Sequence, residues 1–403
     1  MKLLKKISLP YKVLAISLFL LTFMVVPGSN EIFHDPIVWF FPGAPVIYVF
    51  FIYIAATIIA IMSTRFVDGI GISLISRTVI CIVPLLYIQN IEGFSSHYYV
   101  VIVTFCAYYI FRSNKTIQFQ SLYSIILFFS VIWSIQVIYT FWYCDVDFWD
   151  LTYKNYMRIP IAASNVIAAY LSPSLLLLLT TDYNSKKYKI IISTILIIGL
   201  LLTKSRGGIL SFLICYVLYL CIIKYKTNLF KMLLIWILGY LCLSLIGDIH
   251  EVQIFMMGYD VEGQSVNAAN LSSGRLDIFQ SEFDRFLNHP FFGNGMVFNQ
   301  YTSKAGAHNF IIELLVQSGI IGMLTYVIPI IYVLKKIFLR LYDKHIASWT
   351  FFLLTYIIEG LIEVTFFNYT TDILFWGTLG LLMNHIDSNR NKIRDLSDSA
   401  LTN

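Results

Sequence analysis

The segment GAHNFIIELLVQSGIIG, residues 306–322, joins a polar beginning to a long apolar run. From Asn309 to residue 334 the chain has the composition of a membrane-spanning helix, which needs about 20 mainly apolar residues. The segment nevertheless opens with His308 and carries Glu313 early in the apolar run. It therefore predicts a transmembrane helix whose entrance holds groups suited to proton transfer and hydrogen bonding.

The rest of the chain has the same apolar character. Of its 403 residues, 58% are hydrophobic and 13% are charged, whereas a soluble chain is about 25% charged. We predict an all-α polytopic membrane protein in which residues 1–403 form a single integral membrane domain. About 12 transmembrane helices are expected, near 13–27, 45–62, 72–90, 97–111, 117–141, 159–180, 189–203, 207–223, 231–247, 309–334, 347–366 and 371–386.

The distribution of positive charge predicts the orientation of these spans. With the N-terminus inside the cell, 21 of the 28 Lys and Arg residues fall on the cytoplasmic side. Cytoplasmic loops collect Lys and Arg, so both termini are predicted to be cytoplasmic. His308 is then at the outer surface, and the long connection 248–308, between the ninth and tenth spans, is an extracytoplasmic loop. The seven remaining cations are predicted to face outward: Lys154, Arg158, Lys204, Arg206, Arg275, Arg285 and Lys304.

Other classes of protein have little support in the sequence. No basic run with interleaved aromatic residues is present, so we expect no nucleic-acid partner. The six cysteines have neither the spacing of metal ligands nor that of a disulfide framework. We therefore interpret them as ordinary small apolar residues; no metal and no cofactor is expected.

Three of the outward cations occupy positions suited to an anion. Arg206 lies in LLLTKSRGGIL, a short turn between two spans, where Gly207 and Gly208 leave room for a ligand to approach the backbone. Arg275 follows Gly274 at a predicted helix start, and Arg158 stands at the outer mouth of the sixth span. Arginine offers paired donors that fit phosphate oxygens, so a lipid-bound phosphate or pyrophosphate is the expected ligand. An Arg206 that only reaches the interface, and a His308 that only caps its helix, are the alternatives.

Four motifs in this order resemble the O-antigen ligase and polymerase superfamily: TKSRGG at 203–208, SSGR at 272–275, HPFFGNG at 289–295 and GAHNFIIELLVQSGIIG at 306–322. Together with RIPIAASNVIAAYLSPSLLLLL at 158–179, they make residues 150–330 an O-antigen ligase-like region. The resemblance implies a GT-C type fold with a large extracytoplasmic loop.

The resemblance also implies an inverting glycosyltransferase that works without a metal or nucleotide. Arg206 and Arg275, with Arg158 as a weaker match, are implied to bind the pyrophosphate of an undecaprenyl-pyrophosphate-linked oligosaccharide. His308 is implied to act as the base on the acceptor hydroxyl. Asn309, Glu313, Gly207 and Gly208 are expected to support this site.

The expected activity is polymerisation of lipid-linked repeats into O-antigen or capsule at the outer face of the bacterial cytoplasmic (inner) membrane. An O-antigen ligase that transfers glycan to the lipid A core of lipopolysaccharide is the alternative; Gly208 departs from the Ala-Trp that often follows Ser-Arg-Gly in ligases. A flippase is a third reading, with Glu359 and Glu363 as its intramembrane carboxylates. A chain-length regulator and a flippase are expected partners.

Overall fold

The computed structural model of the chain describes residues 8–25, 41–64, 67–87, 97–114, 116–143, 158–226, 275–295, 308–363 and 365–401. These residues are almost entirely helical. The helices are α1 (Leu9–Phe23), α2 (Pro45–Thr64), α3 (Gly69–Ile80), α4 (His97–Arg112), α5 (Phe119–Tyr143), α7 (Ser164–Thr180), α8 (Lys186–Leu202), α9 (Arg206–Tyr219), α13 (Arg275–Asn288), α14 (Phe310–Phe338), α15 (Lys344–Ile362) and α16 (Tyr369–Leu401). The short strands β1 (Met24–Val25) and β2 (Phe41–Pro42) pair in parallel, and β3 (Arg158–Ile159) and β4 (Ala162–Ala163) pair antiparallel.

The helices have the length and composition of a polytopic membrane protein. Among the described residues, six helices are long and apolar enough to cross a membrane: α2, α5, α14 and α15, with α3 and α9 each extended by a following turn. Helices α1, α4 and α7 are shorter apolar helices. Eleven of the 12 predicted spans coincide with a described helix, and the span at 231–247 lies outside the described residues. The membrane class is confirmed, whereas the number of crossings and the GT-C architecture stay predictions.

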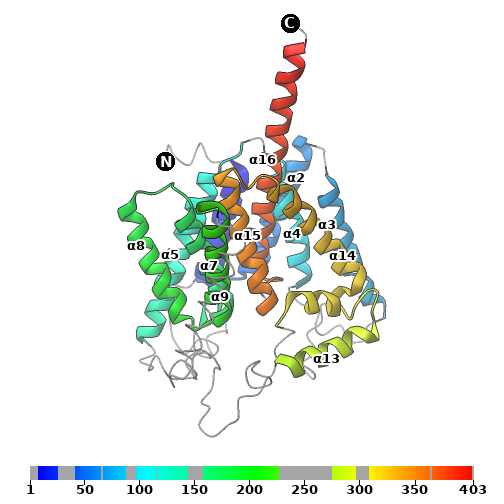
Figure 1. Cartoon of the computed structure of the whole chain (residues 1–403). Helices are drawn as coiled ribbons and strands as arrows, with labels where there is room; N and C mark the ends of the chain where they lie inside the picture. The colour runs from blue at the N-terminus through cyan, green and yellow to red at the C-terminus, as the bar shows by residue number, and fades with distance from the viewer. Residues whose placement is uncertain are drawn as a thin grey trace.

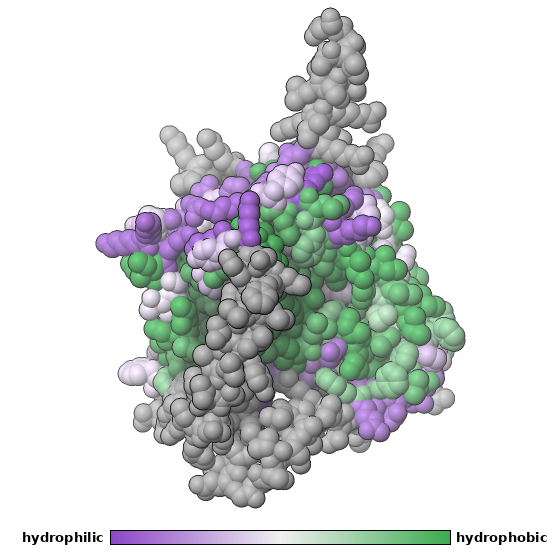
Figure 2. All heavy atoms as spheres, viewed as in Figure 1, coloured by the Kyte–Doolittle hydropathy of each residue, from purple (hydrophilic) through white to green (hydrophobic). Residues whose placement is uncertain are grey.

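The two ends of the helix bundle are different. The C-terminal part of α16 projects from one end, and α13 lies across the opposite end (Figure 1). A broad apolar belt separates hydrophilic residues at these two ends on the face seen in Figure 2. Such a belt between polar ends is the arrangement expected of a bundle that stands across a bilayer.

Helix α7 forms the centre of the bundle, where it packs against α5, α8, α9 and α15. Its residues 167–178 are all buried. The polar side chains within this stretch have partners, since Ser172 Oγ donates to the carbonyls of Ala168 (2.7 Å) and Gly208 (2.8 Å). A polar group that is buried without water must find such a partner, so these contacts make α7 compatible with a membrane interior.

Helix α14 is broken where the sequence predicted a continuous span. Gly319 has φ 64° and ψ −171°, and the 290–295 segment fills the break. The opened carbonyls of Val316 and Gln317 accept from Asn294 N (2.6 Å) and Gly295 N (3.0 Å), and Ile320 N donates to Pro290 O (2.9 Å). The HPFFGNG motif thus replaces the hydrogen bonds that the helix loses at its kink.

Glycine is required on both sides of this junction. A Cβ on Gly319 would lie 2.3 Å from the carbonyl carbon of Phe291, and a Cβ on Gly293 would lie 2.5 Å from the backbone of Gln317. Gly293 also has φ 75°, a region that other residues rarely adopt. The sequence contains the HPFFGNG motif, but only the structure explains the glycines at this junction. They are needed because the backbone of the motif contacts the backbone of α14.

One further expectation needs correction. Arg77, counted above with the cytoplasmic cations, lies inside α3 and is 1% exposed, because α3 begins at Gly69. Helix α13 begins at Arg275, where the sequence predicted a helix start.

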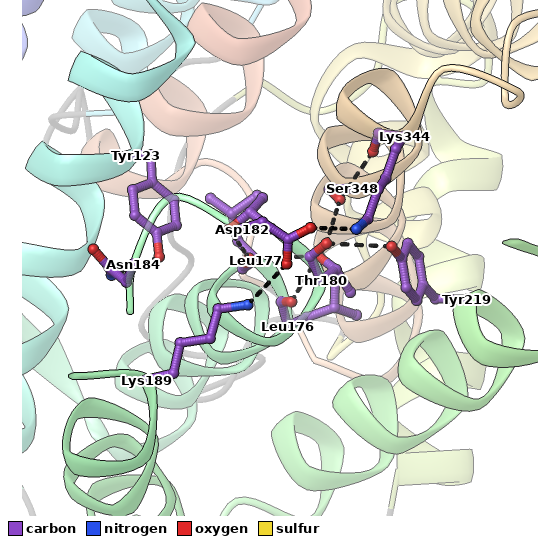
Figure 3. A network of polar contacts seen from close by, with 11 residues as sticks. Tyr123, Leu176, Leu177, Thr180, Asp182, Asn184, Lys189, Tyr219, Lys344 and Ser348 are labelled. Atoms are coloured by element: carbon purple, nitrogen blue, oxygen red, sulfur yellow. Dashed lines mark hydrogen bonds and ion pairs between the residues drawn. The ribbon is translucent and has the colours of Figure 1, made fainter. Parts of the chain in front are cut away.

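The α7–α8 connection is fastened at the end of the bundle from which α16 projects (Figures 1 and 3). Asp182 forms ion pairs with Lys344 of α15 and with Lys189 of α8 (3.5 Å to the latter). The carbonyl of Thr180 accepts from Tyr219 of α9 (3.2 Å) and Ser348 of α15 (3.1 Å). These contacts join α7, α8, α9 and α15 far from the helix ends described next.

Candidate active site

Three helix ends meet at the end of the bundle opposite the α16 projection: the beginnings of α9 and α14 and the end of α15. A Cβ built on Gly207, at the beginning of α9, would lie 3.1 Å from Ile362 and 3.5 Å from Glu363 of α15. Asn309, just before α14, donates from Nδ2 to the carbonyl of Leu361 (2.9 Å). Segments more than 100 residues apart in the chain are therefore neighbours here.

His308 pairs with a carboxylate at this meeting point. Its Nδ1 lies 2.8 Å from Oε2 of Glu363, and the side chains are 26% and 6% exposed. An ionised Glu363 accepts a hydrogen bond from the Nδ1–H group, which leaves the lone pair of the ring on Nε2. His308 also has φ 46°, and such unusual backbone conformations cluster at functional sites. The pair can accept a proton from a hydroxyl group placed at Nε2.

Asn309 fixes the backbone that carries His308. Its Oδ1 accepts from the N–H groups of Ile311 (2.9 Å) and Ile312 (3.2 Å), so Asn309 is the N-cap of α14. Because its Nδ2 is bonded to α15, one side chain both begins α14 and ties it to the helix that ends at Glu363. Glu313, one turn further on, is buried and accepts from Gln317 Nε2 (2.6 Å).

Arg206 is the first residue of α9 and is partly exposed. The N-cap of α9 is Ser205, whose Oγ accepts from Gly208 N (3.3 Å). Lys204, immediately before the cap, has φ 50°. The TKSRGG motif therefore folds into a tight turn that places a guanidinium at a helix N-terminus, where the helix dipole also favours an anion.

The two glycines after Arg206 serve helix packing, which differs from the predicted role of admitting a ligand to the backbone. Both are buried. A Cβ on Gly208 would lie 2.5 Å from Cβ of Ala168 in α7 and 3.2 Å from Oε1 of Glu359 in α15. The absence of side chains lets α9 approach α7 and α15 closely, and this approach brings Arg206 to the end of α15.

Glu359 lies one turn further into α15 than Glu363 and is fully buried. Its Oε2 accepts from Ser211 Oγ of α9 (3.3 Å), while Oε1 has no hydrogen-bond partner. It is thus held between α9 and α15, close to Gly208. Within the described ranges no group of three His, Cys, Asp or Glu side chains is arranged to hold a metal.

The predicted site residues are described to different degrees. The structure brings together His308, Asn309 and the Arg206–Gly208 turn. Arg158 lies in β3 shortly before α7, and Arg275 begins α13, but their side chains lie outside the described part of the chain. Glu363 was predicted only as an intramembrane carboxylate, because nothing in the sequence connects it to a histidine 55 residues earlier.

Comparison with known proteins gives one finding on family. Residues 191–327 match the family model described as O-antigen ligase. No curated protein matches the chain. The matched residues include Arg206, Arg275 and His308 and stop before Glu363. This match, and the motifs that fall within it, support the resemblance of residues 191–327 to the O-antigen ligase/polymerase superfamily of membrane proteins.

Proposed function

We propose that the chain is an inverting glycosyltransferase that moves an oligosaccharide from undecaprenyl pyrophosphate to an acceptor hydroxyl at the outer face of the cytoplasmic membrane. The observation that carries the proposal is the His308–Glu363 pair at 2.8 Å, next to the helix end that bears Arg206. A base and a cation at the same bundle end suit a reaction between a hydroxyl group and a lipid-bound pyrophosphate.

Arg206 and Arg275, with Arg158, bind the pyrophosphate in this proposal. Arg206 and Arg275 each stand at the beginning of a helix, where free N–H groups add to the attraction for an anion. Negative charge grows on the pyrophosphate as the bond from its oxygen to the anomeric carbon breaks. Arginine contacts that strengthen with this charge lower the barrier, because they stabilise the transition state more than the ground state.

His308 activates the acceptor. The acceptor oxygen attacks the anomeric carbon from the face opposite the pyrophosphate and inverts its configuration. Its proton passes to Nε2 of His308, while Glu363 stabilises the resulting imidazolium through Nδ1. Undecaprenyl pyrophosphate leaves, and the proton returns to solvent.

We favour polymerase activity over ligase activity because the chain has Gly208 after Ser-Arg-Gly and carries the SSGR element. The acceptor is then the non-reducing end of another lipid-linked repeat. The extracytoplasmic loop 248–308 and the ligase-like region 150–330 belong to this proposal. A flippase that delivers the donor and a chain-length regulator are its partners.

The test is transfer by the purified protein in detergent, with the lipid-linked oligosaccharide fraction extracted from cells that lack this gene. Longer lipid-linked chains support polymerisation, and transfer to added lipid A core oligosaccharide supports ligation. Detergent abolishes compartments, so a flippase gives neither product. Failure of both reactions, together with movement of the same fraction across liposome membranes, would replace the proposal with transport.

A further inference from the structure

A second charged cluster lies within the bundle, behind the candidate site. Arg77 of α3 is 1% exposed, and its Nε and Nη2 have no hydrogen-bond partner. Its guanidinium carbon lies 4.3 Å from the ring centre of Tyr326 in α14 and 5.3 Å from that of Phe367. An arginine buried in a membrane protein is costly, and such residues usually serve a function.

The negative partner of this cluster is Asp372 of α16, which is fully buried. Tyr326 connects the two charges, since its ring faces Arg77 and its hydroxyl donates to Oδ1 of Asp372 (3.0 Å). Trp376 Nε1 donates to the same hydroxyl (3.1 Å). Arg77, Tyr326 and Asp372 thus form a connected unit that joins α3, α14 and α16, which we call the buried triad.

The buried triad holds the turn between α15 and α16. The second oxygen of Asp372, Oδ2, accepts from the backbone N–H of Phe367 (2.8 Å). Phe367 has φ 67°, a conformation that is unfavourable for a bulky residue and that persists only where contacts enforce it. The contacts here are the bond to Asp372 and the guanidinium of Arg77 over the Phe367 ring.

The same turn carries Glu363 and is packed against the segment that carries His308. Phe366 packs against Phe310, the first residue of α14, with ring centres 5.0 Å apart and the rings tilted by 43°. Thr365 N donates to the carbonyl of Glu363 (2.9 Å). A shift of the backbone at Phe367 therefore moves Glu363, which lies in the same turn. It also moves the beginning of α14, because Phe366 contacts Phe310.

We infer that the buried triad is a positioning device, which holds the α15–α16 turn so that Glu363 stays against His308. The inference rests on the proposed function for its catalytic consequence. Arg77 and Asp372 are positioning residues, since they act through the turn. If one charge is removed, the other stays buried without an opposite charge beside it, and the turn is displaced as that group moves towards water. If both are removed, no uncompensated charge stays buried.

The experiment compares Asp372→Asn, Arg77→Met and the double variant in the full-length protein. The amide introduced by Asp372→Asn still offers an oxygen to Phe367 N, so the double variant keeps the turn without any buried charge. We expect each single variant to lower kcat by about tenfold or more, with the KM for the extracted lipid-linked fraction within about twofold, because displacement of a catalytic group slows turnover more than binding. The double variant recovers most of the lost kcat.

A second readout does not need glycan transfer. Diethylpyrocarbonate acylates neutral imidazole nitrogen, and peptide mass spectrometry gives the rate at His308 alone. Glu363→Gln defines the rate without the carboxylate. The single variants should approach that rate, while the double variant returns towards the wild type. If the His308→Ala variant transfers glycan normally, the proposed function is wrong. The acylation rates of His308 in the other variants still test whether the buried triad positions Glu363.

Asp68→Asn is the matched control. Like Asp372, Asp68 accepts a hydrogen bond from a tyrosine hydroxyl, that of Tyr108 (2.6 Å). It also accepts one from Arg112 (2.9 Å), but it lies at the other end of α3. This variant should leave kcat and acylation unchanged. Single variants with normal kcat and acylation per folded molecule, or a double variant no better than Asp372→Asn, would overturn the inference.

Discussion

At the residue scale, His308 acquires its chemistry from a partner on another helix. A histidine without a partner can carry its proton on either ring nitrogen, whereas a carboxylate at Nδ1 fixes the tautomer and leaves Nε2 to accept a proton. Glu363 is 6% exposed and lies 2.8 Å from that nitrogen. The pair therefore consists of one residue that the motif reveals and one that the fold supplies.

Glu363→Gln should lower turnover by about 10–100-fold, the usual effect of removing an orienting partner. Glutamine keeps the size of the side chain and loses the charge that stabilises the imidazolium. His308→Ala should lower turnover by about 10²–10⁴-fold. Because the two residues act together, the double variant should be no slower than His308→Ala. Initial rates with the extracted donor fraction check this; additive losses would mean that the two act independently.

Arg206→Lys should slow transfer nearly as much as Arg206→Ala. Lysine keeps the positive charge but loses the paired donors that hold two pyrophosphate oxygens. Loss of one charge-assisted hydrogen bond, about 1.5–3 kcal/mol, corresponds to roughly ten- to a hundredfold in rate. Rates should be normalised to folded protein, and Lys187→Ala, in the exposed first turn of α8, is the control. A fully active Arg206→Lys protein would leave Arg206 as an interfacial residue only.

At the element scale, the break in α14 is a joint between a helix and a loop. The 290–295 backbone donates to the carbonyls of Val316 and Gln317, so α13 and both halves of α14 are one unit. Tyr87, which follows α3, donates to the carbonyl of Gly293 and lies against His289 with ring centres 4.7 Å apart. The joint therefore extends to a third segment of the chain.

Gly319→Ala should destabilise the protein by more than the roughly 1–3 kcal/mol of a left-handed backbone alone, because the added Cβ would lie 2.3 Å from Phe291. The melting temperature in detergent measures the effect. Gly69→Ala is the matched control, since a Cβ there has nothing within 4 Å and should change stability by less than about 0.5 kcal/mol. Equal melting temperatures for the two variants would show that the joint can relax.

Asp182→Asn should have a small effect that depends on pH. The hydrogen bond from Lys344 lowers the pKa of Asp182, so its folded pKa is below its unfolded value, and its stabilisation is present at neutral pH and lost as the pH falls below the ordinary value of about 3.9. The carboxylate is 72% exposed, and exposed pairs contribute at most about 1 kcal/mol. Melting of both proteins between neutral and acidic pH should show curves that converge in acid. A difference that grows in acid would contradict this account.

At the scale of the whole molecule, the arrangement of charge agrees with the direction in which the helices run. Removal of Arg77 from the cytoplasmic count still leaves 20 cations there and seven outside. The α7–α8 connection lies at the end from which α16 projects, while α13 lies at the other end (Figure 1). Lys186, Lys187 and Lys189 follow this connection at the beginning of α8. The proposed chemistry requires that the α13 end be extracytoplasmic.

Ser281→Cys in α13 should react with a membrane-impermeant maleimide in cells whose outer barrier has been opened. Ser185→Cys in the α7–α8 connection should react only after the cytoplasmic membrane is lysed. Both serines are exposed, so access to the reagent and not burial determines the result. The native cysteines at 81, 106, 215 and 221 are buried and give little background. The reverse pattern would overturn the orientation and, with it, the proposed site of action.

The sequence by itself determined the membrane class, most helix positions and the resemblance of residues 191–327 to the O-antigen ligase family. Hydropathy and the preference of Lys and Arg for one side depend on composition along the chain, and the motifs TKSRGG and GAHNF are local. Their residues could therefore be read without knowing what lies beside them. Of the candidate site, His308, Asn309 and Arg206 were predictable in this way.

Only the tertiary structure decided the partners of these residues. Glu363 meets His308 because α9 approaches α15 across Gly207 and because Asn309 ties α14 to α15. The break in α14 and the buried triad of Arg77, Tyr326 and Asp372 are likewise contacts between distant segments. Hydrophobic periodicity reports whether a residue is buried, but it does not report against which helix. For that reason the sequence predicts His308 at the beginning of α14, whereas its pairing with Glu363 is seen only in the packed helices.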